Sequence, residues 1–152
     1  MAVVGVATAC LSHRSRYGTP YWDTGFFAIQ FIDMVAFSLL VWQGLRMRHD
    51  PPAHKRLMLL ATLAISNAGW GRMLGPSVAG VMGTGFGGTW VIDFSVITLI
   101  LVAFLAYDAI TRGRPHPVVV RGSLLISVLG LVACWCYPQP WWQSISARLL
   151  AP

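Results

Sequence analysis

The sequence predicts an all-α membrane protein: a bundle of four transmembrane helices with a partial N-terminal helix and an interfacial C-terminal helix. Apolar residues make up 56% of the 152 residues and charged residues only 11%, whereas soluble domains carry roughly 25% charged residues. Four apolar stretches approach the length of about 20 helical residues that crosses a bilayer. We therefore predict one integral membrane domain over 1–152, with spans at about 26–45, 57–74, 90–107 and 118–137.

The chain begins with an apolar segment, residues 1–12, that is too short to cross a bilayer and is typical of the last half of a membrane helix. Tyrosine and tryptophan follow within 17–22, and such amphipathic rings suit the headgroup layer. The first full span, 26–45, carries Gln30 and Asp33. We expect these two side chains on one face, because residues three apart are neighbours on a helix.

The second predicted span, 57–74, starts after two prolines and a basic cluster, and only Asn67 interrupts its apolar run before Arg72. The region 69–88 then holds eight glycines. Glycine costs about 1 kcal/mol relative to alanine inside a helix. We therefore predict a loop over 75–88 that dips back toward the membrane and is shielded there by protein.

The third predicted span, 90–107, carries Asp93 near its start, and a short basic turn leads to the fourth span, 118–137. Three apolar residues of the tail repeat every fourth position: Trp141, Ile145 and Leu149. This spacing predicts a short helix that lies in the membrane interface with its apolar face down.

The distribution of lysine and arginine predicts the orientation in the membrane. Seven of the eleven basic residues lie in the 46–56 and 112–121 connections: Arg46, Arg48, Lys55, Arg56, Arg112, Arg114 and Arg121. Cytoplasmic loops carry an excess of such residues. We therefore predict that these two connections are cytoplasmic and that both ends of the chain lie on the other side.

When the predicted spans alternate in direction across the membrane, five polar residues fall in the outer half of the bundle: Gln30, Asp33, Asn67, Arg72 and Asp93. An ionised group inside a bilayer costs roughly 3 kcal/mol or more unless it is paired or wetted. Two interpretations stay open for this polar intramembrane cluster. It forms a polar site or proton path with Arg72 as the counter-charge, or an internal ion pair that holds three helices together.

A second polar cluster, the inner rim, joins the seven basic residues above with five others: His49, Asp50, His54, Asp108 and His116. His54 and His116 each precede a predicted span on the same side, which makes them candidate haem or metal ligands. The alternative is a solvated basic rim that touches anionic lipid headgroups.

The remaining sequence features do not indicate a disulfide framework, a nucleotide site, a hydrolase or a nucleic-acid partner. Three cysteines, Cys10, Cys134 and Cys136, give no disulfide framework. The glycine pattern at 83–88 matches GxGxxG, but no strand precedes it. All five acidic residues are aspartate, so paired glutamates for hydrolysis are excluded. The net charge of +6 lies in short clusters between apolar runs, which argues against a nucleic-acid partner. No catalytic residues are predicted.

Five motifs follow one another along the chain. They are PxxHKRLMLLAT, a GR pair, an aspartate in the next span, YD and TRGRxHP: Pro51, His54–Thr62, Gly71-Arg72, Asp93, Tyr107-Asp108 and Thr111–Pro117. In these motifs the chain resembles an uncharacterised family of bacterial multi-pass inner-membrane proteins. The resemblance implies a bacterial inner-membrane location. It also implies that longer relatives carry two further upstream helices with histidines similar to those of di-haem membrane cytochromes. We expect this chain to be an N-terminally short version or one whose start is placed late.

The favoured function is an integral membrane subunit or scaffold that packs against another membrane component, either another membrane protein or a second copy, within the lipid bilayer. We expect no catalysis of its own. One alternative is a haem- or quinone-binding redox protein that uses His54 and His116. The other is a small proton-linked transporter that uses Asp33, Arg72 and Asp93.

Overall fold

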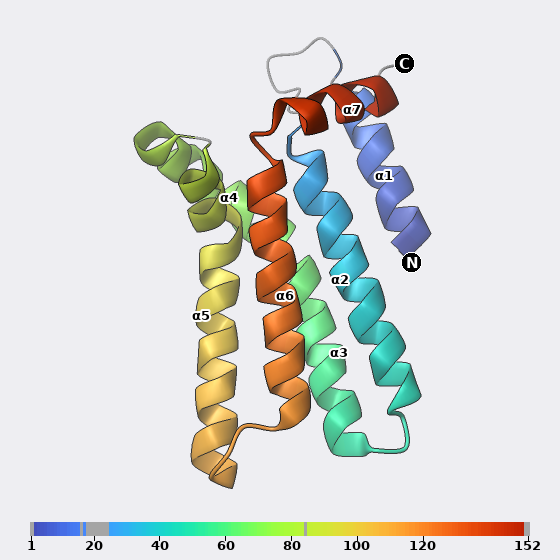
Figure 1. Ribbon diagram of the computed structural model, residues 1–152, viewed down its shortest axis with the longest axis vertical. Coiled ribbons are helices and arrows are strands. Elements are labelled where there is room, and N and C mark those ends of the chain that lie inside the picture. The colour runs from blue at the N-terminus through green and yellow to red at the C-terminus, as the bar shows by residue number, and fades with distance from the viewer. Residues whose placement is uncertain (1, 16, 18–24, 84, 151–152) are drawn as a thin grey trace.

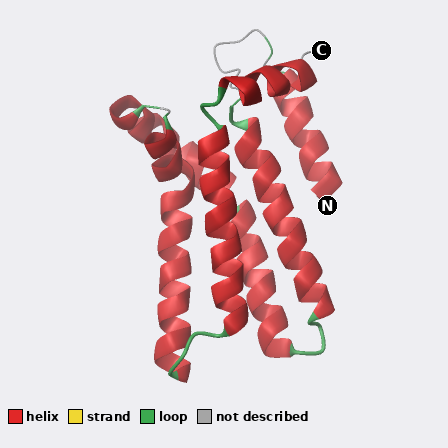
Figure 2. Ribbon diagram, viewed as in Figure 1, coloured by secondary structure: helices red, strands yellow, loops and turns green. Residues whose placement is uncertain are grey.

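The computed structural model describes residues 2–15, 17, 25–83 and 85–150, and none of these lies in a strand. They form seven helices: α1 (Ala2–Arg14), α2 (Phe27–Arg46), α3 (Pro51–Ile65), α4 (Asn67–Met82), α5 (Phe86–Arg112), α6 (Pro117–Cys136) and α7 (Pro140–Leu150). The predicted all-α class is confirmed for this part of the chain (Figure 2). Three helices, α2, α5 and α6, are long and apolar enough to cross a membrane, which indicates a membrane location.

The core lies where four helices meet along the bundle axis. It is built from side chains that are at most 4% exposed: Leu40, Leu57, Leu60, Ile97 and Ile126. Helix α6 packs against α2, α3 and α5, so it occupies the middle of the bundle (Figure 1). Apolar side chains also cover the outside, and Leu99 and Leu124 are 70% and 63% exposed. Such an apolar surface is expected in contact with lipid chains, because exposing it to water would be unfavourable.

The helix ends near the inner rim follow local sequence rules. Asp50 caps α3 through its Oδ1, which accepts the Ala53 N–H at 3.3 Å, and a proline occupies the first helical position. His116 and the following proline start α6 in the same way. Gly113 ends α5 with φ = 74°, a left-handed conformation that glycine adopts without steric cost.

The predicted span 57–74 is not one helix. Helix α3 ends at Ile65 and α4 begins at Asn67. The hydroxyl and the N–H of Ser66 both donate to the Leu63 carbonyl, at 2.8 and 3.2 Å, and such local bonds compete with the regular helical ladder. The 15 residues of α3 rise only about 22 Å at 1.5 Å per residue. The predicted count of four spans is therefore not confirmed.

The predicted loop over 75–88 is wrong for most of its length. Helix α4 continues to Met82 and leaves only a short turn before α5, where Gly83 has φ = 69°. Helix α4 packs along α5, and tertiary packing offsets the poor helix propensity of glycine. Glycine also allows a close contact between α4 and α5, because a Cβ on Gly71 would collide with the Asp93 side chain.

The two terminal helices lie at one end of the bundle, opposite the connections 47–50 and 113–116 (Figure 1). The predicted short tail helix is present as α7, and α1 packs against α2 and α7. Aromatic rings hold α7 in place. Trp142 stacks on Phe27 of α2 with centroids 6.4 Å apart, and Trp141 lies 6.3 Å from Trp135 of α6.

Candidate functional site

One carboxyl group of α2 is buried against the break between α3 and α4. Asp33 is 7% exposed and Asn67 is fully buried. The Asn67 Nδ2 donates to both oxygens of Asp33, at 3.1 Å and 3.4 Å. A new helix starts at Asn67, directly after the break at Ser66. The polar residue that interrupts the apolar run therefore lies where the helix itself is interrupted.

Asp93 of α5 supplies a second buried carboxyl group to the polar intramembrane cluster. It is 3% exposed and interacts electrostatically with Asp33. Gly71 of α4 lies directly against the Asp93 Oδ1, and any Cβ at this position would collide with it. The absence of a side chain at position 71 therefore sets how closely α4 approaches the carboxyl group.

The structure brings together three of the five residues predicted for this cluster: Asp33, Asn67 and Asp93. Gln30 is half-buried one turn before Asp33. The side chain of Arg72 lies outside the described residues, so its predicted role as counter-charge stays a prediction. The sequence analysis missed Cys134, which is fully buried on α6 within electrostatic range of both carboxyl groups. No spacing or motif in the chain signals that proximity.

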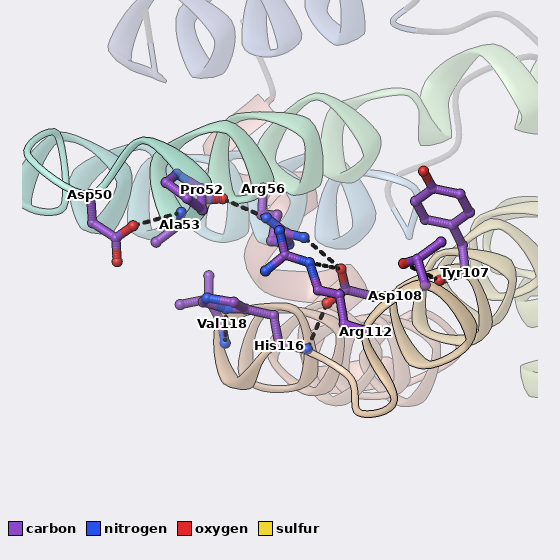
Figure 3. Close-up of polar contacts among 10 residues, drawn as sticks. Asp50, Pro52, Ala53, Arg56, Tyr107, Asp108, Arg112, His116 and Val118 are labelled. Carbon is purple, nitrogen blue, oxygen red and sulfur yellow. Dashed lines mark hydrogen bonds and ion pairs between the residues drawn. The ribbon is translucent and has the colours of Figure 1, made fainter.

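At the inner rim, Asp108 is the centre of the polar contacts (Figure 3). It is fully buried, and its Oδ1 accepts Arg56 Nη2 at 2.5 Å and lies 3.6 Å from Arg112 Nε. Its Oδ2 accepts the backbone N–H of His116 at 2.6 Å. Arg56 also donates to the Pro52 carbonyl at 3.0 Å. One carboxylate thus connects α3, the end of α5 and the start of α6.

The two candidate histidine ligands have different ring tautomers. His54 Nδ1 lies 2.8 Å from the Gly44 carbonyl, which only accepts, so this nitrogen carries a proton, and in the neutral ring Nε2 is then the acceptor. His116 Nδ1 accepts the Val118 N–H at 3.3 Å, so its proton lies on Nε2. Only His54 therefore has the arrangement typical of a metal-bound imidazole, in which Nδ1 donates to a carbonyl.

The remaining basic residues of the inner rim differ in their contacts. Arg46 lies over the Trp42 ring, 4.0 Å from its centroid, and Arg48 Nε donates to His49 at 3.1 Å. Lys55 and Arg121 are exposed. Arg112 and Arg114 line a cavity of about 340 Å³ together with three residues of the α5–α6 turn: Pro115, His116 and Pro117.

A second cavity, of about 230 Å³, lies between α5 and α6 and is lined mainly by apolar side chains, among them Trp90, Phe94 and Ile126. In the described part of the chain, no three His, Cys, Asp or Glu side chains gather where they could hold a metal ion. Comparison with protein-family models, with curated proteins and with solved structures gives no match to this chain.

Proposed function

We propose that this protein is an integral membrane subunit or scaffold that packs against another membrane component and has no catalytic activity of its own. The observation that carries the proposal is the open side of α4. Among the described residues this helix packs along α5 and touches α3. Its outer side chains stay uncovered, with Met73 71% and Val81 85% exposed.

The shape of α4 also suits a helical partner. Gly69 and Gly80 have no heavy atom within 4 Å of where a Cβ would stand. Small residues let membrane helices approach closely, which is how such helices associate when lipid removes the hydrophobic driving force. The exposed glycines and the exposed apolar side chains lie on the same helix, so α4 offers both close approach and contact area.

The buried polar groups are consistent with this role. The Asp33–Asn67 contact joins α2 to α4, and the Arg56–Asp108 ion pair joins α3 to α5. Each contact links segments more than thirty residues apart in sequence. A scaffold needs such polar contacts, because apolar packing alone does little to select one arrangement of membrane helices over another.

We further propose that the protein lies in a bacterial inner membrane with the 46–56 and 112–121 connections in the cytoplasm. The two turns inside these connections lie at the same end of the bundle (Figure 1). Together the connections hold seven of the eleven lysine and arginine residues, as expected for cytoplasmic loops.

The proposal is tested by purifying the tagged protein in a mild detergent and measuring the intact mass and absorption spectrum of everything that co-elutes. A scaffold gives a stoichiometric membrane partner or a multiple of 16.6 kDa. Co-elution should fall at least tenfold in Met73→Gln/Val81→Gln. The matched control, Leu99→Gln/Leu124→Gln, changes two similarly exposed apolar residues on α5 and α6 and should keep the partner.

Three results would contradict the proposal in different ways. A haem band that disappears in His54→Ala would favour the redox alternative. A colourless protein that elutes as a single copy would remove the scaffold and leave proton-linked transport, for which the buried Asp33–Asn67 pair is the candidate site. Equal loss of the partner in both double variants would show that α4 is not the contact surface.

A further inference from the structure

The cavity at the turn between α5 and α6 is lined by basic side chains, whereas most of the molecule is apolar. Its lining consists of two arginines, one histidine and two prolines: Arg112, Arg114, Pro115, His116 and Pro117. No acidic side chain is among them. We refer to this cavity, of about 340 Å³, as the basic pocket.

Three side chains of the basic pocket offer hydrogen-bond donors. Arg112 turns its Nε toward Asp108 and is 48% exposed, which leaves the outer edge of the guanidinium for another acceptor. Arg114 is exposed and has no ion pair with any described residue. His116 uses Nδ1 to accept the Val118 N–H, so its Nε2 carries the ring proton and donates.

The charges around the pocket do not balance. The single carboxylate of Asp108 is shared between Arg56 and Arg112, and Arg114 adds a further positive charge. The pocket also lies at the N-terminus of the 20-residue helix α6, which carries the positive end of the helix dipole. An anion with several oxygens would complete this arrangement, since forked guanidinium donors match phosphate.

The position of the pocket indicates the source of the anion. It joins α5 and α6, two helices that are apolar and long enough to cross a membrane, so it stands at the level of the lipid headgroups. The helix ends that lead into it also carry exposed apolar side chains, with Ile110 84% and Val120 43% exposed. We propose that the basic pocket binds the phosphate of an anionic phospholipid headgroup, whose acyl chains lie along α5 and α6.

The test is native mass spectrometry of the detergent-solubilised full chain, titrated with phosphatidylglycerol and, separately, with phosphatidylcholine. We expect phosphatidylglycerol to be retained at least fivefold better. Arg114→Gln should weaken its binding about fivefold, as one basic residue near an anionic surface contributes on that scale. His116→Asn keeps a good helix cap but removes the Nε2 donor, and it should weaken binding about threefold.

The matched control is the double variant Arg46→Gln/Arg48→Gln, which removes two charges from the same rim outside the pocket. We compare it with Arg112→Gln/Arg114→Gln, for which a loss of at least tenfold is expected. Equal losses in the two double variants would overturn the proposal, because the lipid would then sense only the total charge of the rim.

A second arm separates the two sources of phosphate. Inorganic phosphate at millimolar concentration should neither bind the lipid-free protein nor displace phosphatidylglycerol, because it lacks the acyl chains that the exposed apolar side chains would contact. Displacement that depends on Arg114 would overturn the assignment to a lipid and make the pocket a site for soluble phosphate. The outcome does not depend on whether α4 binds a partner.

Discussion

Loss of the Asp108 carboxylate should destabilise the fold. It is fully buried and accepts hydrogen bonds from Arg56 and from the backbone of His116. Asp108→Asn would leave the largely buried Arg56 without its counter-charge, and removing one partner of a buried pair typically costs 3–5 kcal/mol. We expect the unfolding free energy, measured by denaturant titration in mixed micelles, to fall by about 3 kcal/mol.

The control is Arg112→Gln, because Arg112 is 48% exposed and 3.6 Å from the same carboxylate. Exposed pairs contribute less than about 1 kcal/mol, so this change should be small. The double variant Arg56→Gln/Asp108→Asn should be more stable than the sum of the single changes predicts, since both charges are gone. Additive losses would show that the two residues act independently.

Sequence analysis placed Asp33, Asn67 and Asp93 in one cluster, as the structure does, but it could not assign the individual contacts of the buried aspartates. Asp33 and Asp93 interrupt long apolar runs, and that alone predicts burial inside a membrane bundle. The Arg56–Asp108 pair joins residues 52 positions apart, and no periodicity encodes such a contact. The ring tautomers of His54 and His116 depend on which backbone group each imidazole meets, and this becomes visible only in three dimensions.

At the scale of helices, the predicted ends agree with the structure where the length of an apolar run sets them. They disagree where local hydrogen bonds end a helix. The ends of α2 and α6 agree with the apolar runs within one residue of 26–45 and 118–137. The break at Ser66 results from its own hydroxyl and N–H bonding to Leu63. Average helix propensities do not predict such a local hydrogen bond. They also leave out the packing against α5 that keeps the glycine-rich α4 helical.

The contact of α6 with α2 and α3 depends on one missing side chain. A Cβ on Gly122 would lie 2.5 Å from Leu60 Cδ1 and 3.4 Å from Leu40 Cδ2, and both leucines are fully buried. Gly122→Leu should therefore lower the unfolding free energy by about 1–3 kcal/mol, the usual cost of overpacking. The measurement is thermal unfolding in detergent, followed by circular dichroism.

Gly87→Leu serves as the comparison, because nothing lies within 4 Å of a Cβ at that position. It makes the same chemical change in the first turn of α5, and leucine has the better helix propensity. We expect it to leave the melting temperature unchanged or slightly raised. A similar loss in both variants would mean that the bundle does not depend on the close approach of α6.

At the scale of the whole molecule, the fold fixes which segments share an end of the helix bundle. The turns at 47–50 and 113–116 lie at one end, and α7 lies at the other (Figure 1). In a cysteine-free background, Ser144→Cys should react with a membrane-impermeant maleimide in spheroplasts, whereas His49→Cys should react only after lysis. Both positions are exposed, so reactivity reports the side of the membrane.

The opposite labelling pattern would show that the seven basic residues of the two connections face outward. The three-dimensional structure would survive such a result, but the proposed cytoplasmic location would not. The sequence placed the two connections on one side of a four-span bundle, and the structure places their turns at one end of the helix bundle (Figure 1). It could not show that α4 packs along α5 and leaves Met73 and Val81 exposed.

The shortness of α3 has a consequence for how the chain would cross a membrane. Its 15 residues rise about 22 Å, whereas the hydrocarbon layer is about 30 Å thick, and α4 begins two residues after α3 ends. A crossing at this position therefore needs both helices and passes through the break at Ser66. The first residue of α4, Asn67, binds Asp33 of α2, so the joint between the two short helices is anchored to a third.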